Sequence, residues 1–494
     1  MEKKGKLELT WVGKYEEEKL EPRILIEDKS KSYGDPNTEN MLIHGDNLLA
    51  LMALQSEFSG KVKCIYIDPP YNTGNAFEHY DDGIEHSIWL SMMKKRLELL
   101  QKLLSEDGFI FVQIDNYEMP YLKVLMDEVF GRSNFINDII WKRKGGSVNP
   151  TNKLNNMTDY ILWYAKSSAA EIYPVYTMDD EETQKYINKR FNKIDENGRR
   201  YRLSPIISPT YSKSLVYEYK GYKSPPNGWS LSLEKMKKFE EEGRLYFPEN
   251  KNQRIQRKQF LDEYKGRPIG NLWTDINVIN PMSTERLNFV GQKPEMLIAR
   301  VLELASKEGD LILDSFLGTG TTMDVAHKMK RKWIGIEMGN QCYDFCQKRI
   351  NNTIDGEKTG VAEKYGWQGG GGYKFYELAE PLLVKSKVLP VYQINPSYTW
   401  DMVCEAICKI EGFTYEPSGE FQGHSSENRF IHITEEFVNT KYVMSIMKNL
   451  GDKQSLLIYC KKNQADMILP ENVEVKKIPK DLLDKCNFES EVQE

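Results

Sequence analysis

Hydrophobic residues in the first third of the chain form short runs separated by stretches of helical spacing. Apolar runs at residues 41–44, 62–67 and 109–112 have the length and side-chain types of buried strands. Between them, apolar residues recur every three or four positions over 48–54 and 88–104, which predicts two amphipathic helices. Strands that alternate with helices of this length predict a mostly parallel, doubly wound sheet.

The same alternation returns after residue 293. The pattern predicts a helix over 294–306, a strand at 311–314 that meets a glycine-rich loop, a helix through 323–329 and a strand at 333–337. We therefore expect both segments to belong to one Rossmann-like α/β domain.

A polar stretch separates the two halves of this pattern. Residues 168–280 are rich in Tyr, Lys, Arg, Asn and Pro, and one clear helical segment occurs there, at 233–242. Beyond about residue 380, weaker signals, including a helix over 437–447, predict a small C-terminal α/β domain. The expected divisions are an N-terminal arm (1–30), a first half of the Rossmann-like domain (31–167), an inserted domain (168–280), a second half (281–379) and a C-terminal domain (380–494).

The composition is that of an ordinary globular protein. The 494 residues are 40% hydrophobic and 28% charged. No run of about 18 apolar residues is present, so we expect no membrane span. The first residues lack the apolar stretch of a signal peptide, and seven cysteines without regular spacing do not predict a disulfide framework. These features predict a cytoplasmic protein.

Two cysteine pairs could suggest a zinc site. Cys342 and Cys346, like Cys404 and Cys408, are one helical turn apart in apolar segments, whereas structural zinc sites usually take two ligands from a tight turn. The histidines show no ligand spacing. We therefore expect no metal and interpret the cysteines as buried small side chains.

The net charge of −6 argues weakly against nucleic acid as a partner, but the basic residues are clustered. An acidic protein with a local basic groove can still hold DNA. A solvated charged face is the alternative interpretation of such clusters. The residues that we expect to contact DNA are Lys142, Arg143, Lys144, Arg199, Arg200, Arg202, Arg254 and Arg257.

Asp68, Pro69, Pro70 and Tyr71 follow the strand at 62–67, at the end where open parallel sheets bind ligands. An aromatic amine is a poor nucleophile because its lone pair is delocalised into the ring. The Asp68 carboxylate and the Pro69 carbonyl could each accept a hydrogen bond from such an amine, which favours a pyramidal nitrogen, and the prolines stiffen the turn. Tyr71 offers a flat face for stacking an unpaired base. A plain proline turn is the alternative.

A second candidate site follows the strand at 311–314. Gly318 and Gly320 let the backbone approach a ligand, and the next helix offers free N–H groups. Glu337 ends the following strand, near the offset of about 20 residues expected of an acid that binds ribose hydroxyls. The motif lacks the third dinucleotide glycine and the lysine of a phosphate-binding loop, so a nucleoside without phosphates fits better, with Asp314 near the ammonium of an amino-acid tail. A simple strand–helix turn is the alternative.

In combination, these features resemble the beta-class amino methyltransferases of DNA restriction–modification systems. In that family the catalytic tetrapeptide precedes the recognition insert and the cofactor loop comes last, which is the order found here over about residues 40–380. Stretches at 65–74, 113–116, 271–275 and 367–372 are most similar to type III modification subunits.

The resemblance implies an enzyme that transfers a methyl group from S-adenosylmethionine to the N6 amino group of adenine in double-stranded DNA, after the base has flipped out of the helix. Asp at position 68, rather than Ser, is typical of adenine enzymes. Asp68 and Pro69 would hold the amine and Tyr71 would stack on the base. The residues that would line the cofactor pocket are Asp46, Lys293, Asp314, Phe316, Gly318, Gly320, Thr321, Thr322 and Glu337.

Within that pocket, Asp46 would lie near the adenine end of the cofactor, with a simple helix N-cap as the alternative. Two positions depart from the family pattern, because Ser315 stands where Pro is frequent and Thr319 where Ser is frequent, but neither change removes a contacting group. The resemblance also implies a homodimer and a restriction or other defence subunit as partner.

Four other functions are alternatives. A protein glutamine methyltransferase would have Asn at position 68 and an upstream cofactor loop, unlike this chain. A cytosine-N4 methyltransferase stays open because the same hydrogen bonds serve either base. A catalytically inactive DNA-binding regulator would be expected to lack Asp68 or the loop glycines, which are present. A nuclease is suggested only by Glu474 and Lys476, a triplet that is frequent by chance.

Overall fold

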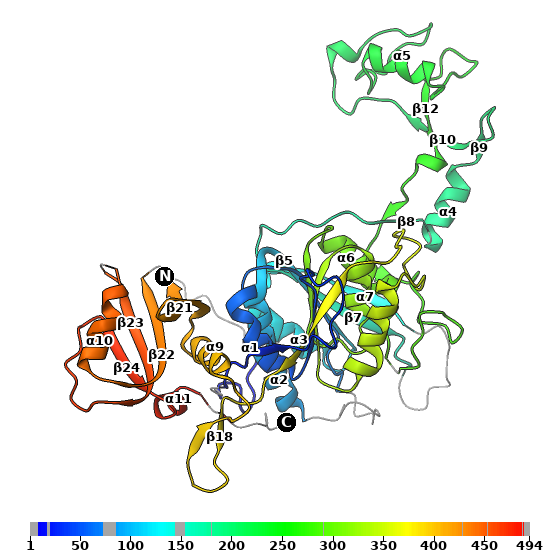
Figure 1. Ribbon diagram of the computed structural model, residues 1–494. Coiled ribbons are helices and arrows are strands. Elements are labelled where there is room, and N and C mark those ends of the chain that lie inside the picture. Colours follow the sequence, from blue (N-terminus) through cyan, green and yellow to red (C-terminus); the bar gives the residue numbers. More distant parts are fainter. Residues whose placement is uncertain are drawn as a thin grey trace. The chain divides into compact units, whose positions relative to one another are not determined.

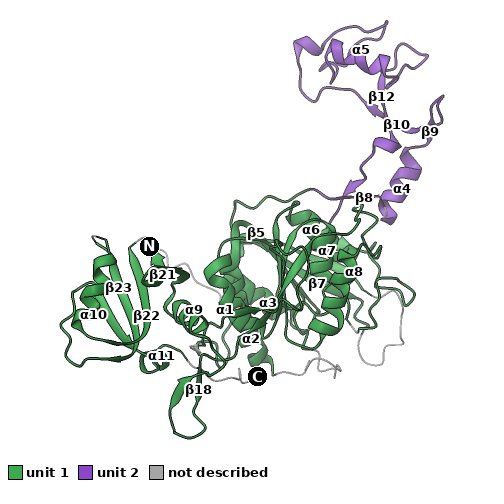
Figure 2. Cartoon of the chain, in the orientation of Figure 1, with its two compact units in different colours: residues 1–173, 271–494 green, residues 174–270 purple. Residues whose placement is uncertain are grey.

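The computed structural model describes residues 8–16, 20–72, 85–143, 154–178, 180–289, 291–426, 428–451, 453–486 and 488. The chain forms two compact units, one made of residues 1–173 and 271–494 and the other of residues 174–270 (Figure 2). The second unit lies within the insert predicted at 168–280.

The first unit is built on a large sheet with the strand order β1-β17-β3-β16-β15-β4-β5-β7-β6-β14, with β2 on β17 (Figure 1). Neighbours from β17 to β5 are parallel, and β7 is the antiparallel strand between β5 and β6. The predicted doubly wound, mostly parallel α/β sheet is therefore confirmed. The strands are β1 (Leu25–Glu27), β2 (Tyr33–Gly34), β3 (Met41–His44), β4 (Val62–Ile67), β5 (Leu104–Ile114), β6 (Phe135–Lys142), β7 (Thr158–Ala165), β14 (Leu272–Trp273), β15 (Leu311–Asp314), β16 (Lys332–Glu337) and β17 (Gly372–Leu378).

Helices cover this sheet on both faces, as α1 and α2 on one side and α6 and α7 on the other show (Figure 1). They are α1 (Asn47–Phe58), α2 (His86–Leu103), α3 (Met119–Met126), α6 (Glu295–Ala305), α7 (Thr321–Lys328) and α8 (Lys348–Ile354), with short 3-10 or π-helical turns at η1 (Asp127–Gly131), η2 (Arg132–Asn134) and η5 (Cys342–Gln347).

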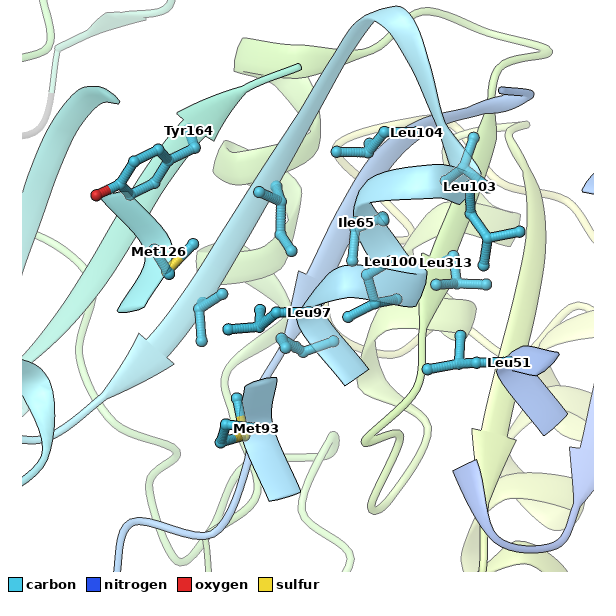
Figure 3. Packing of buried hydrophobic residues seen from close by; sticks show 14 of the residues in the cluster. Leu51, Ile65, Met93, Leu97, Leu100, Leu103, Leu104, Met126, Tyr164 and Leu313 are labelled. Carbon is cyan, nitrogen blue, oxygen red and sulfur yellow. The ribbon is translucent and has the colours of Figure 1, made fainter. Parts of the chain in front are cut away.

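Alternate residues of the central strands form the main core with α1, α2 and α3. Ile65 on β4 and Leu313 on β15 are fully buried there, together with Leu97 and Leu100 from the apolar face of α2 (Figure 3). Burial on both faces explains why these strands are continuous apolar runs rather than alternating ones. This packing fixes the positions of the strands and of the turns that follow them.

Three segments differ from the sequence-based expectations. Within the N-terminal arm predicted at 1–30, Leu25–Glu27 pairs with β17, and so short a strand shows no periodicity. The strand predicted at 109–112 extends over Leu104–Ile114. The helix predicted over 437–447 begins only at Thr440, because Phe437 and Val438 continue the preceding strand.

The second unit contains a four-stranded sheet of order β11-β12-β10-β9, a separate β8–β13 pair and two helices. The helix predicted at 233–242 is confirmed as α5. The helix α4 was not predicted. Asp180 caps the N-terminus of α4, and only two residues of α4 are buried. The elements are β8 (Tyr176–Thr177), α4 (Glu181–Arg190), β9 (Lys193–Ile194), β10 (Arg200–Pro205), η3 (Lys213–Leu215), α5 (Leu233–Glu241), β11 (Leu245–Tyr246), β12 (Gln256–Phe260), η4 (Leu261–Glu263) and β13 (Arg267–Pro268).

The C-terminal segment forms a five-stranded sheet in the order β20-β21-β22-β23-β24, preceded by a β18–β19 hairpin. Its elements are β18 (Leu383–Lys385), β19 (Tyr392–Ile394), α9 (Trp400–Glu411), β20 (Thr414–Ser418), β21 (Phe421–Ser426), β22 (Arg429–Val438), α10 (Thr440–Ile446), η6 (Met447–Asn449), β23 (Ser455–Asn463), β24 (Val473–Lys477) and α11 (Lys480–Leu483). Among the described residues, no helix combines the length and the apolar character needed to cross a bilayer.

Candidate active site

The predicted site residues gather at one edge of the central sheet. Strands β3, β16, β15 and β4 are parallel neighbours, and their carboxyl ends lead to Asp46, Glu337, Asp314 and Asp68 respectively. From β4 the chain returns to the sheet at β5 on one side, and from β15 it returns at β16 on the other. The chain therefore leaves these two adjacent parallel strands toward opposite sides of the sheet. Doubly wound sheets bind ligands at such a point.

The turn that carries Asp68 is held from both sides by buried side chains. The indole nitrogen of Trp89 on α2 donates a hydrogen bond to the Pro70 carbonyl at 2.9 Å. Asn72, with a φ of 56°, donates from its amide to Glu118 at 2.8 Å, and Glu118 is fully buried. These bonds add to the stiffness of the prolines, so the Asp68 carboxylate has a defined position.

Lys293 connects the two predicted sites. Its ammonium donates a hydrogen bond to Oδ2 of Asp68, across a sequence separation of 225 residues, and lies 5.3 Å from the ring centroid of Tyr71. Oδ1 of Asp68 is buried and accepts no hydrogen bond. The carboxylate is thus fixed through one oxygen, while its other oxygen has no hydrogen-bond partner within the protein.

Sequence reasoning missed the partner of Tyr71. The Tyr71 hydroxyl donates to Oδ2 of Asp159 on β7 at 3.3 Å, and the same oxygen accepts from the Gln113 amide at 3.1 Å. Burial, with the nearby Asp68 and Asp159 carboxylates, raises the pKa of Tyr71 well above its usual value. A carboxylate at the start of the apolar run 160–165 was the only sequence signal for Asp159.

The glycine-rich loop adopts a conformation that requires glycine. Gly318 and Gly320 have φ angles of 58° and 77°, in the left-handed region. The backbone N–H of Gly318 donates to Glu337 at 2.8 Å. A side chain at Gly320 would lie 2.4 Å from Met323, whereas the corresponding space beside Gly318 is open. The loop is therefore packed at Gly320 and accessible at Gly318.

Asp314 anchors the start of this loop. The residue is only 3% exposed, and its carboxylate accepts hydrogen bonds from the Phe316 N–H at 2.9 Å and from the Thr322 hydroxyl at 2.6 Å. Burial, with a smaller contribution from the neighbouring carboxylates Asp68 and Glu337, raises its pKa to about 7.

The pocket residues fit a nucleoside cofactor with a cationic tail. The Ser315 hydroxyl is buried without a hydrogen-bond partner, and the space beside Gly318 is open, so the loop presents both a polar group and room for a ligand. Carboxylates at Asp314 and Glu337 suit an ammonium group and ribose hydroxyls. The donor set and the shape of the loop therefore agree with S-adenosylmethionine.

Three predicted pocket residues make bonds within the protein. The Thr322 hydroxyl binds Asp314, and the Thr321 hydroxyl accepts a hydrogen bond from Arg349 at 3.0 Å. Asp46 caps α1 by accepting from the Leu49 N–H at 3.0 Å, the alternative considered for this residue. These groups orient the loop and α1 from inside the protein.

The predicted DNA-contacting residues fall into two groups. In the first unit, Lys142 is exposed at the end of β6, Arg143 forms an ion pair with Asp159 at 3.3 Å, and Lys144 lies outside the described residues. In the second unit, β10 and β12 pair antiparallel with Ser204 opposite Arg257. Because side chains alternate along a strand, Arg200, Arg202 and Arg257 share one face of that sheet.

Two other basic residues of the second unit differ in their surroundings. Arg199 forms ion pairs with Asp262 and Glu263 at 2.8 and 3.0 Å, which reduces its availability for phosphate. Arg254 is exposed in the segment before β12.

The residues behind the nuclease and zinc alternatives have ordinary structural roles. Lys476 forms an ion pair with the buried Glu411 at 3.2 Å, while Glu474 is 57% exposed. The four cysteines weighed as zinc ligands are all buried and free, and no cluster of three or more metal-ligating side chains occurs in the part of the chain that the structure describes.

The fold and this pair of turns are those of a Rossmann-like methyltransferase domain. Residues 62–348, more than half of the chain, match the N6/N4 methyltransferase family described as "DNA methylase". The chain belongs to this DNA methylase family, and the resemblance to modification subunits seen in the sequence is confirmed.

Similar proteins come from bacterial restriction–modification systems. The "Probable type III restriction-modification enzyme HindVI Mod subunit" of Haemophilus influenzae is 34% identical over 420 residues, which cover 71% of this chain and 55% of that protein. The "Type II methyltransferase M.EcaI" of Enterobacter cloacae is 34% identical over 60% of this chain and 66% of its own. The chain thus spans between half and two thirds of the length of these relatives.

A similar solved structure is that of the PvuII DNA methyltransferase (cytosine-N4-specific). It is 14% identical and has a TM-score of 0.36, over 70% of this chain and 93% of that chain.

Proposed function

We propose that this protein transfers a methyl group from S-adenosylmethionine to the N6 amino group of adenine in double-stranded DNA. The observation that carries the proposal is the Asp68 carboxylate, which has one oxygen bound to Lys293 and a second, buried oxygen with no partner. This carboxylate stands beside the loop at Gly318 and Gly320, because β4 and β15 are adjacent parallel strands.

The Asp68 turn supplies the chemistry that an aromatic amine needs. Oδ1 of Asp68 accepts one amine hydrogen and the Pro69 carbonyl accepts the other, so the nitrogen becomes pyramidal and its lone pair is directed away from the ring. An unpaired buried acceptor is costly in the free protein, and the amine satisfies it on binding. Lys293 keeps the carboxylate oriented through Oδ2 and need not leave when the amine arrives.

The loop residues hold the cofactor, which supplies an electrophilic methyl group on a sulfonium. Asp314 binds its ammonium, Glu337 its ribose hydroxyls, and Phe316 with Gly318 forms the wall of the pocket. Lys293 lies between this wall and the base site, and Thr321, Thr322 and Asp46 position the surrounding backbone. Tyr71 stacks on the target base and Pro70 holds the turn rigid.

DNA binding is assigned to the basic groups at 142–144 and in the second unit. Arg200, Arg202 and Arg257 present one face of a sheet, and phosphate contacts from such a face provide affinity without sequence information. Flipping the adenine costs a few kcal/mol, which these contacts must offset. Arg254 adds an exposed cation, whereas Arg199 contributes only after exchanging its carboxylate partners for phosphate.

The proposal is tested by replacing Asp68 with alanine. Asp68→Ala should bind S-adenosylmethionine with unchanged affinity in calorimetry but transfer no tritiated methyl group to DNA. The matched control is Asp107→Ala, which removes the partner of Lys63 at the other end of the β4–β5 pair and should retain full transfer. Substantial turnover by Asp68→Ala would refute the role of this carboxylate.

The modified base decides between adenine and cytosine. Single-molecule sequencing of DNA from a host that expresses this chain should find N6-methyladenine at every copy of one short motif. N4-methylcytosine at that motif instead would replace the adenine assignment while leaving the site assignment intact.

We further propose that the chain is the modification component of a restriction–modification system and acts as a homodimer with a restriction subunit as partner. Support comes from relatives named as Mod subunits, such as that of Haemophilus influenzae. Light scattering of the purified chain and co-purification with the restriction subunit test these two assignments separately. A monomer that methylates DNA fully would remove the dimer from the proposal.

A further inference from the structure

Asp159 is a charged residue in a position that a sheet normally fills with an apolar side chain. It lies near the start of β7, next to the apolar run 160–165, and is completely buried. Burial raises the pKa of its carboxyl group, whereas the cations of Lys293 and Arg143 act in the opposite direction. A buried carboxylate is expensive for a fold that needs only packing, so a role beyond packing is expected.

The contacts of Asp159 lead directly to the base-stacking residue. Its Oδ2 accepts from the hydroxyl of Tyr71 at 3.3 Å and from the Gln113 amide at 3.1 Å, and Gln113 in turn accepts from Tyr66 at 2.5 Å. Oδ1 faces Arg143 at 3.3 Å. Asp159 is therefore fixed from three sides and has one contact that reaches the candidate active site.

We propose that Asp159 is a positioning residue that fixes the ring plane of Tyr71 and thereby sets the surface on which the flipped base stacks. The hydroxyl bond to Asp159 holds one end of the ring, and the packing of Tyr71 against the main core holds the other. The inference rests on the proposed function, because it assigns a role in binding the target base. Asp159 itself touches neither base nor cofactor in this assignment.

The experiment compares Asp159→Leu, Tyr71→Phe and the double variant in steady-state methyl transfer. Loss of this bond frees the Tyr71 ring to leave its stacking plane, so each single change should raise KM for DNA, by up to about tenfold if the free energy of the bond is spent on holding the ring, while kcat and the affinity for S-adenosylmethionine stay unchanged. The double variant should be no worse than Asp159→Leu alone, because that change already removes the bond between Asp159 and Tyr71. Asp159→Asn, which keeps a neutral acceptor, should restore part of the loss.

A second Tyr–Asp pair, whose tyrosine lies on the same strand as Asp159, is the matched control. The hydroxyl of Tyr164, also on β7, donates to Asp127 in η1 at 2.7 Å. Tyr164→Phe and Asp127→Leu remove an equivalent bond and should leave KM for DNA unchanged. A rise in KM in these variants equal to that of Tyr71→Phe would overturn the assignment in favour of a general effect on the sheet.

Base flipping provides an independent readout. With 2-aminopurine in place of the target adenine, the wild-type chain should increase the fluorescence on binding, and Asp159→Leu should give a smaller increase at saturating protein. Should Asp159→Leu fail to fold, Tyr71→Phe alone decides the question, since it removes only the hydroxyl. An unchanged KM and an unchanged signal in Tyr71→Phe would overturn the inference.

The failure of this inference differs from the failure of the proposed function. Wild-type protein that transfers no methyl group to any DNA would refute the proposed function. Wild-type transfer together with additive or absent effects of the Asp159 and Tyr71 changes would refute only the role of Asp159.

Discussion

At the scale of single residues, charge at the candidate site is arranged so that each carboxylate has a different surrounding. Asp68 is bound through one oxygen by Lys293, Glu337 is bound by backbone N–H groups, and Asp314 is the most deeply buried. Burial raises the pKa of Asp314 to about 7. Asp314 offers the clearest test of this arrangement.

Cofactor affinity should depend on pH through Asp314. Its pKa is raised to about 7, so below pH 7 the carboxyl is mostly protonated in the free protein and must lose its proton to pair with a bound ammonium; the cost of that loss falls as the pH rises towards 7. Affinity for S-adenosylmethionine should therefore increase by up to about tenfold per pH unit below 7 and then level off. Calorimetry between about pH 5.5 and 7.5 measures this slope and the levelling above it.

The control for that profile is Asp314→Asn, which cannot ionise. It should bind the cofactor more weakly than the wild type at pH 7.5, and its affinity should not change with pH below about 7. A wild-type profile as flat as that of the variant would contradict the placement of the ammonium at Asp314.

At the scale of elements, the strand–loop–helix segment from β15 to α7 depends on the glycine at its end. Gly320→Asp should abolish measurable S-adenosylmethionine binding, because a side chain there meets Met323 and the backbone of Cys346 at 3.3 Å, with φ in the left-handed region. Gly309→Asp is the matched control, since Gly309 has a φ of 87° but open space around it. Calorimetry should find normal binding in the control, and normal binding by Gly320→Asp would refute the pocket.

The helices behind this loop are joined by a buried network of charges. Lys328 on α7 binds Glu295 on α6 at 2.9 Å and Asp324 at 3.0 Å, and Arg349 on α8 binds the same two acids. Glu295 begins the helix that follows Lys293. The network therefore connects the segment that carries Lys293 to the helix that follows the glycine-rich loop. Removal of one cation leaves a buried negative charge without compensation.

Lys328→Met should accordingly lower the free energy of unfolding by about 3–5 kcal/mol. Lys348→Met is the control on α8, because that lysine is 70% exposed and its ion pair with Asp344 is long, at 3.6 Å. Urea unfolding should find the control within about 0.5 kcal/mol of the wild type. Equal losses of unfolding free energy in both variants would show that the buried network stabilises the protein no more than an exposed ion pair does.

At the scale of the whole molecule, the second unit is an insertion whose ends lie together. The strands β8 and β13 pair antiparallel, and the Ile269 N–H donates to the Val175 carbonyl at 3.1 Å. The flanking chain is held by the first unit, where Tyr173 binds the Leu304 carbonyl and the Asn271 carbonyl binds Ile140. The insert can therefore be removed without opening the sheet.

Replacement of residues 174–270 by a flexible linker of about four residues should leave a folded protein that still binds S-adenosylmethionine. Its affinity for DNA should fall, because the phosphate contacts of the arginine face on β10 and β12 are gone. Calorimetry and a filter-binding assay measure the two effects. Loss of cofactor binding in a folded deletion variant would show that the first unit is not complete without the insert.

Sequence and tertiary structure determine different features of this protein. The sequence alone determined the Asp68 turn, the loop at Gly318 and Gly320 and the alternation of strands and helices, because strand–turn–helix signals are local and each occupies a few consecutive residues. It also placed Glu337, through its offset from the loop. The roles assigned to these residues stay predictions until the variants are measured.

Only the tertiary structure decided which of these residues meet. Asp159 reaches Tyr71 because β7 pairs antiparallel with β5, and Lys293 reaches Asp68 because α6, which Lys293 precedes, contacts β4. Neither arrangement has a local signal, since the pattern of an apolar strand or helix does not say which neighbour it packs against. The partner of a buried charge is set by strand order, which depends on how the whole chain packs.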